Sequence, residues 1–199
     1  MKEIIPKNSR YVPFVQQKSC CVPACISMIM YKHRIPLISQ ELLGYHLGLI
    51  VSKENRELYW HPRVGKRPLA GYGTRIYQKQ YHPNKVFPKL KIPLKMIYHP
   101  ISSFVTIKSF TDFIIESIKK DKDILVCFDH GKLSGNNIQG GHICLLDYIY
   151  KSKGLIRLID PQQNQPKWRM VKISTLKKAM EFHSDNKSAG FWEFMKTSV

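Results

Sequence analysis

The sequence predicts an α+β fold in which a helix near the N-terminus packs on a mainly antiparallel sheet. Apolar residues recur with helical spacing over 22–33, and three later segments, at 124–128, 142–150 and 155–159, are rich in strand-forming residues. The last two segments are separated only by the short polar run 151–154, which predicts a hairpin. Because helix comes first and strands follow in succession, the order favours α+β over a parallel sheet.

The composition indicates a folded protein. Of the 199 residues, 43% are hydrophobic and 11% are aromatic, enough to build a core. We interpret residues 1–199 as a single domain with an irregular insert at 52–93. The sequence has no apolar run that could span a membrane and no apolar stretch typical of a secretory signal. It therefore predicts a cytoplasmic protein, with export as an effector left open.

The elements of the N-terminal half follow from local signals. Residues 11–16 look extended, and Pro23 suits the first turn of the helix at 22–33. A shorter helix is expected over 39–47, with Ser39 as its cap. The insert contains five prolines and three glycines, which argue against a regular helix or a central strand there.

The C-terminal half alternates between the two kinds of periodicity. Besides the three strands above, we expect four further elements in this half: a strand at 94–98, an amphipathic helix at 109–119, a helix at 174–182 and an edge strand at 190–194.

The cysteines indicate reduced thiols rather than a disulfide framework. Their number is odd and they lack the Cys-x-x-Cys spacing of a structural zinc site, so neither a metal nor a cofactor is predicted. The five are Cys20, Cys21, Cys25, Cys127 and Cys144. Cys20 and Cys21 stand at the predicted start of the first helix, where free N–H groups and the helix dipole favour a thiolate.

A histidine and an aspartate accompany these thiols. Gly141 and His142 open one predicted strand, and Asp160 ends the next. A hairpin brings both to one end of the sheet, although a two-residue turn at 152–153 would set His142 opposite Gln163 rather than Asp160. Cys, His and Asp suit nucleophile, general base and orienting group. His130 is a reserve base.

Residues 12–29 resemble the nucleophile region of papain-like peptidases that cut double-glycine leaders, the bacteriocin-processing family, and its stand-alone relatives. That family carries a glutamine, then Cys-Gly-Pro-Ala, then an apolar helix; 141–146 and 158–161 resemble its Gly-His strand and Asp-Pro pair. The resemblance implies a papain-like fold with Cys21 as nucleophile, His142 as base and Asp160 as orienting residue. It also implies an oxyanion glutamine at Gln16 or Gln17.

This sequence departs from the family pattern in two places. Val22 replaces the usual glycine after the nucleophile. The family glutamine lies six positions before the cysteine, whereas Gln16 and Gln17 lie five and four positions before Cys21. In addition, the insert has no counterpart, and we expect Arg75 within it, together with Gly141, to contact substrate.

The activity that these motifs imply is that of a cysteine peptidase cleaving a peptide or isopeptide bond of a protein substrate through a thioester acyl-enzyme. An acyl or amide transferase would use the same site, and an inactive homologue remains an alternative. The net charge of +18 supports another alternative, a basic papain-like binding module for nucleic acid or an acidic protein. However, the cations are spread along the chain without a nucleic-acid-binding motif.

Overall fold

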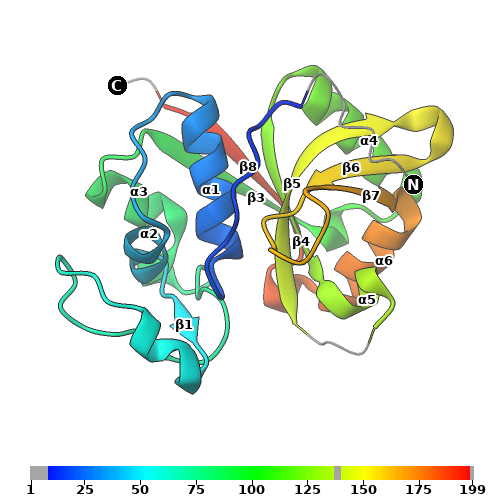
Figure 1. Ribbon diagram of the computed structural model, residues 1–199. Coiled ribbons are helices and arrows are strands. Elements are labelled where there is room, and N and C mark those ends of the chain that lie inside the picture. The colour runs from blue at the N-terminus through cyan, green and yellow to red at the C-terminus, as the bar shows by residue number, and fades with distance from the viewer. Residues whose placement is uncertain (1–8, 137–139, 198–199) are drawn as a thin grey trace.

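A computed structural model describes residues 9–136 and 140–197. Its centre is an antiparallel sheet with the strand order β3-β8-β4-β5-β6-β7 (Figure 1). The strands are β3 (Leu94–Pro100), β4 (Asp123–Asp129), β5 (Gly141–Tyr150), β6 (Leu155–Ile159), β7 (Trp168–Lys172) and β8 (Gly190–Lys196). The helices are α1 (Cys21–Lys32), α2 (Gln40–His46), α3 (Pro83–Lys89), α4 (Ile107–Lys119), α5 (His130–Ser134) and α6 (Ile173–His183).

Both faces of the sheet are buried. Helices α1, α2 and α3 lie on one side of it, and α4, α5 and α6 lie on the other (Figure 1). Along β4 and β5, alternate side chains belong to the two cores: Leu125 and Ile143 pack towards α1, whereas Val126 and Cys144 pack towards α4 and α6. This division explains why the strands read as continuous apolar runs.

Helix α1 is buried over most of its length. Every residue from Val22 to Met30 is buried, and the Cys25 thiol donates to the Ile143 carbonyl at 3.7 Å. The helix therefore lies across β5, with its first residue, Cys21, near the start of that strand. Ser39 caps α2 as expected, its hydroxyl accepting from the Leu42 N–H at 3.2 Å.

The hairpin of β5 and β6 contains a register shift. Tyr148 pairs with Arg157, but Leu146 pairs with Leu158, so Asp147 is an additional residue on β5. A shift of one residue reverses the face on which every subsequent side chain emerges. The hairpin expected at 151–154 is present, but its register is not uniform, and the shift brings His142 and Asp160 onto the same face of the sheet.

Three further features differ from the expectations. The C-terminal strand β8 lies between β3 and β4 instead of at an edge. The edge strand β7 was not predicted. The insert contains α3 as well as β2 (Leu69–Ala70), which pairs in parallel with β1 (Ile50–Val51). The prolines of α3 are tolerated because Pro83 occupies the first turn and Pro88 stands one residue before the helix ends.

Among the described residues, no helix combines the length and the apolar character that crossing a bilayer requires.

Candidate active site

Cys21 lines a cleft in the surface of the protein. It is the first residue of α1, its side chain is partly exposed, and two adjoining pockets of about 400 and 380 Å³ share it in their linings. Tyr72 and Gly73 from the insert line both pockets, as does Gly141 at the start of β5. A hollow of about 650 Å³ beside Tyr11 is larger, but its lining has neither a thiol nor an imidazole.

Cys20 occupies a different environment from its neighbour. Its side chain is fully buried in a small cluster with Leu49, Val51 and Tyr59. Burial raises the pKa of the Cys20 thiol to about 12, although a hydrogen bond with Tyr59 opposes the shift. Cys20 therefore stays protonated near neutral pH, and only Cys21 of the pair faces the cleft.

His142 and Asp160 are in direct contact. The His142 Nε2 lies 2.7 Å from the Asp160 Oδ1, and both side chains are buried. Because an ionised carboxylate can only accept, Nε2 is the protonated nitrogen and donates this bond. The remaining ring nitrogen, Nδ1, is the one available for the hydrogen bond between His142 and Cys21.

Asp160 is held as a carboxylate by several donors. Besides His142, it accepts from the Gln162 N–H at 2.9 Å and from Arg169 Nη1 at 3.2 Å. Arg169 is itself fixed by a 2.9 Å hydrogen bond to the Ser134 hydroxyl. Burial alone would raise the pKa of Asp160, but the bond from His142 and these neighbours lower it to about 2.

The pKa of His142 shifts in the opposite direction. Burial alone would lower it, but the hydrogen bonds with Asp160 and Cys21, together with the charges of these two groups, raise it to about 9. The imidazolium is therefore the favoured form of His142 near neutral pH. An imidazolium beside a thiol at a helix N-terminus is the arrangement that stabilises a thiolate.

The two candidate oxyanion glutamines point in different directions. Gln16 lines the pocket with Cys21, its Oε1 is buried without a hydrogen-bond partner, and its N–H donates to the Pro161 carbonyl at 2.8 Å. The Gln17 side chain instead donates to Glu41 at 2.7 Å, on α2. Of the two glutamines, Gln16 therefore lines the cleft beside Cys21, whereas the Gln17 side chain is directed to α2.

Gly141 and Arg75 also differ in placement. Gly141 lines the cleft, and a β-carbon there would lie 2.7 Å from His183 Nε2. The Arg75 guanidinium instead donates to the Gly48 carbonyl and the Tyr81 hydroxyl, both at 3.1 Å. It ties the insert to the residues that follow α2, and the substrate contact expected of Arg75 stays a prediction. Its neighbours Tyr72 and Tyr77 border the cleft instead.

His130 and Cys144 both lie close to His142. The His130 ring is perpendicular to the His142 ring at 5.2 Å, and burial followed by the charge of His142 lowers its pKa. Cys144 forms a compact group with His142 and Asp160, their potential ligand atoms all lying within 4.8 Å. Burial raises the pKa of Cys144 well above its usual value, which disfavours the thiolate that a metal would need.

Some of the site was not predicted from sequence. Arg169 lies on the unpredicted strand β7, and Trp192, which lines the cleft, lies on a strand expected at the edge. A basic residue in a short strand carries no local signal for contact with an aspartate nine positions earlier.

No family model matches the sequence, and no curated protein matches it at a significant level. The solved structures similar to this chain include a protein from Bacillus anthracis described as a candidate C39-like peptidase. The superposition has a TM-score of 0.57 at 12% identity and covers 97% of this chain and 100% of that one. The fold is thus α+β and papain-like, as expected from the sequence.

Proposed function

We propose that this protein is a cysteine peptidase that cleaves a peptide or isopeptide bond, with Cys21 as nucleophile, His142 as general base and Asp160 as orienting residue. The observation that carries the proposal is the 2.7 Å contact of His142 Nε2 with Asp160, which leaves Nδ1 to the thiol at the start of α1. The likeness to a structure described as a candidate peptidase is consistent with it.

The reaction follows from these positions. The proton shared by the pair lies on His142 Nδ1, so Cys21 reacts as the thiolate partner of the imidazolium and attacks the substrate carbonyl carbon. In this mechanism the Cys21 N–H and the Gln16 side-chain amide donate hydrogen bonds to the oxyanion that forms, a role supported by the position of both residues in the lining of one pocket. The C–N bond then breaks as the imidazolium protonates the leaving amine, and a thioester remains. Neutral His142 then takes a proton from a water molecule, which attacks the thioester; a carboxylic acid is released, and the pair of Cys21 thiolate and His142 imidazolium is restored.

Selective alkylation tests the nucleophile without knowledge of the substrate. We expect iodoacetamide at pH 6 to label Cys21 first among the five cysteines, as mapped by mass spectrometry of the intact chain. Cys20→Ala is the matched control, one residue away, and should leave the labelling unchanged. His142→Ala should slow it markedly, because the thiolate loses its counter-ion. Preferential labelling of Cys20, or none at pH 6, would contradict the proposal.

Peptidase activity is tested by incubating the protein with a proteome-derived peptide library. We expect new peptide termini with the parent protein and none with Cys21→Ala, whose circular dichroism should match the parent. If both proteins yield the same fragments, the activity does not come from this site.

A further inference from the structure

Asp147 determines the face of the sheet on which His142 emerges. It is the additional residue of β5 at the register shift. On its C-terminal side Ile149 packs against the core formed with α4 and α6, and on its N-terminal side Leu146 packs into the same core. Uninterrupted alternation would send these two residues to opposite faces, because they are three positions apart. The shift at Asp147 therefore reverses the face of every residue from Leu146 back to His142.

Asp160 depends on this reversal for its contact. In β6, Ile156 and Leu158 both face the core of α4 and α6, and regular alternation places Asp160 on that face as well. With a uniform register, His142 would point to the opposite side, towards α1, and the 2.7 Å bond to Asp160 could not form.

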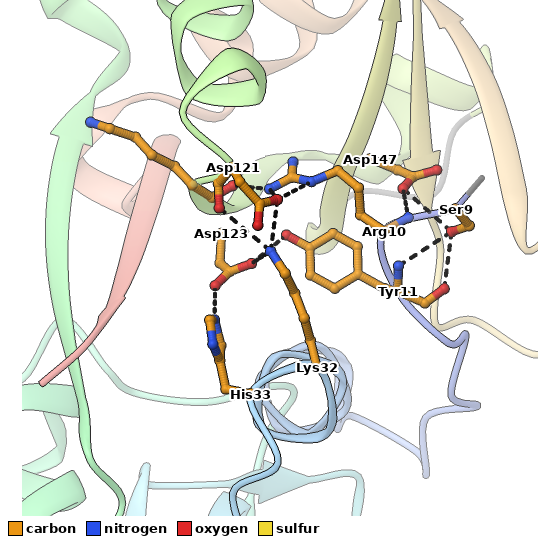
Figure 2. A network of polar contacts seen from close by, with 9 residues as sticks. Ser9, Arg10, Tyr11, Lys32, His33, Asp121, Asp123 and Asp147 are labelled. Atoms are coloured by element: carbon orange, nitrogen blue, oxygen red, sulfur yellow. Dashed lines mark hydrogen bonds and ion pairs between the residues drawn. The ribbon is translucent and has the colours of Figure 1, made fainter.

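The carboxylate of Asp147 is buried, and both of its oxygens have polar partners. Its side chain has 0% exposure. It forms an ion pair with the buried Arg157 Nε, and it accepts from the Arg10 N–H at 2.9 Å and from the Ser9 hydroxyl at 3.3 Å. Figure 2 shows Asp147 meeting the backbone of the N-terminal segment in this way. The bulged residue is thus held by a side-chain ion pair from β6 and by a strap that crosses it, residues 9–11.

The strap also reaches the helix that carries Cys21. Arg10 Nε donates to Asp121 at 2.9 Å, and the Tyr11 hydroxyl donates to Asp123 at 2.7 Å. Asp123 also accepts from Lys32 Nζ, the last residue of α1, at 2.8 Å. In Figure 2 these side chains converge between the strap and the end of α1. One connected network therefore joins the bulge to the nucleophile helix.

We propose that Asp147 is a positioning residue of the site. By holding the β-bulge, its carboxylate keeps His142 in contact with Asp160. Through the strap, it also fixes the position of that pair relative to Cys21. The inference rests on the proposed function for its catalytic meaning. The contact between His142 and Asp160 can be measured independently of catalysis.

The direct measurement is an NMR titration of His142 in the full chain carrying Cys21→Ala, with and without Asp147→Asn. We expect Asp147→Asn to lower the pKa of His142 by at least about one unit, because the imidazolium loses its carboxylate partner. In protein with Cys21 intact, the same substitution should lower the alkylation rate at pH 6 by about tenfold relative to the rate at pH 9.

Glu193→Gln is the matched control. Glu193 is equally buried, at 3% exposure, and pairs with His99 at 3.0 Å and Lys122 at 2.8 Å on a different strand. The Glu193→Gln substitution should destabilise the fold. It should nevertheless leave the His142 titration and the pH dependence of alkylation as they are in the parent. If Asp147→Asn does not fold, Arg157→Lys, which keeps the cation and loses the Nε contact, should produce the same shift in smaller measure.

Two results would overturn the positioning role: an unchanged His142 titration in Asp147→Asn, or an equal shift in Glu193→Gln. Failure of the proposed function has a different signature. In that case the parent protein would show no preferential alkylation of Cys21 at pH 6, while the titration shift caused by Asp147→Asn would remain.

Discussion

The charge state of His142 depends on two neighbours, Asp160 and Cys21. A buried imidazole would normally lose its proton, but Asp160 and Cys21 raise the pKa of His142 to about 9. Its contribution to stability is therefore complete below its ordinary pKa of 6.5 and is lost as the pH rises through about 9. The pKa of Asp160 is lowered to about 2, so its contribution is present above 3.8 and is lost as the pH falls through about 2.

We therefore expect Asp160→Asn to destabilise the protein most between about pH 4 and 6.5, by an amount on the order of 2 kcal/mol, and less at pH 9.5. Urea unfolding of parent and variant at pH 5, 7 and 9.5 gives the difference at each pH. Asp112→Asn, a change to an exposed carboxylate on α4, is the control and should show a difference that does not follow this profile. A difference for Asp160→Asn that is constant from pH 5 to 9.5 would disprove the coupling.

The two glutamines before Cys21 allow a second test at this scale. An oxyanion donor assists acyl transfer, where negative charge develops on oxygen, but not alkylation, where none does. We expect Gln16→Ala to slow acylation by p-nitrophenyl acetate on the order of 10²-fold and to leave the iodoacetamide rate unchanged. Gln17→Ala is the natural control, since its side chain contacts Glu41. Equal acylation rates in both variants would remove Gln16 from the mechanism.

At the scale of the elements, local signals predicted most of the helices and strands. The cap at Ser39, the hairpin at 151–154 and the strand Leu155–Ile159 follow from nearby residues alone. The shift at Asp147 could not be predicted, because a polar residue in a strand usually marks a solvent-facing position. Here it is buried and paired with Arg157, ten positions later and across the hairpin. The place of β8 inside the sheet likewise depends on pairing between distant segments.

The ends of α1 are fixed by different devices. Its N-terminus meets the cleft, whereas Lys32 and His33 at its other end bind Asp123, which also accepts from Tyr11 (Figure 2). The side chain of Asp123 is 3% exposed, but that of Asp121, which also contacts Lys32, is 69% exposed. The buried carboxylate should therefore matter far more than the exposed one.

We expect Asp123→Asn to lower the free energy of unfolding by about 3 kcal/mol, because it leaves the partly buried Lys32 ammonium without its buried carboxylate partner. Asp121→Asn should cost less than about 1 kcal/mol, as is typical of exposed pairs. Both values come from urea unfolding at pH 7, and the comparison is internal because the two residues share Lys32. Similar losses in the two variants would show that burial does not govern this network.

Across the whole molecule, folding makes the surface more basic than the composition suggests. The sequence has 14 acidic residues, and within residues 9–136 and 140–197 five of them are buried, namely Asp123, Asp129, Asp147, Asp160 and Glu193. Of the 32 basic residues, only Arg157 and Lys177 are buried among those that the structure describes. These five buried acids form internal contacts, including those of the candidate site. Most of the basic side chains face solvent instead.

We expect this surface to bind a polyanion, and to do so mainly through the insert. There, exposed Arg63 and Lys66 are interleaved with Trp60, Tyr72 and Tyr77, whose side chains are 56%, 80% and 64% exposed. Cations attract phosphates, and exposed aromatic rings offer stacking surfaces for bases. A mixed-sequence single-stranded oligodeoxynucleotide, followed by fluorescence anisotropy, should bind with an affinity that falls linearly with salt on logarithmic axes.

The location of binding is tested by removing two charges at a time. Arg63→Gln combined with Lys66→Gln should weaken binding at 50 mM salt by about tenfold and reduce the salt slope by about two, the change expected when two phosphate contacts are lost. Lys119→Gln combined with Lys178→Gln removes two exposed charges from α4 and α6, on the other side of the sheet, and should change the affinity much less. Cys21→Ala should bind like the parent, because this surface does not require the thiol.

Equal losses of affinity in the two double variants would mean that the oligonucleotide responds only to the overall electrostatic field of the protein. Absence of binding at 50 mM salt would rule out a role for the positive charge in capturing nucleic acid.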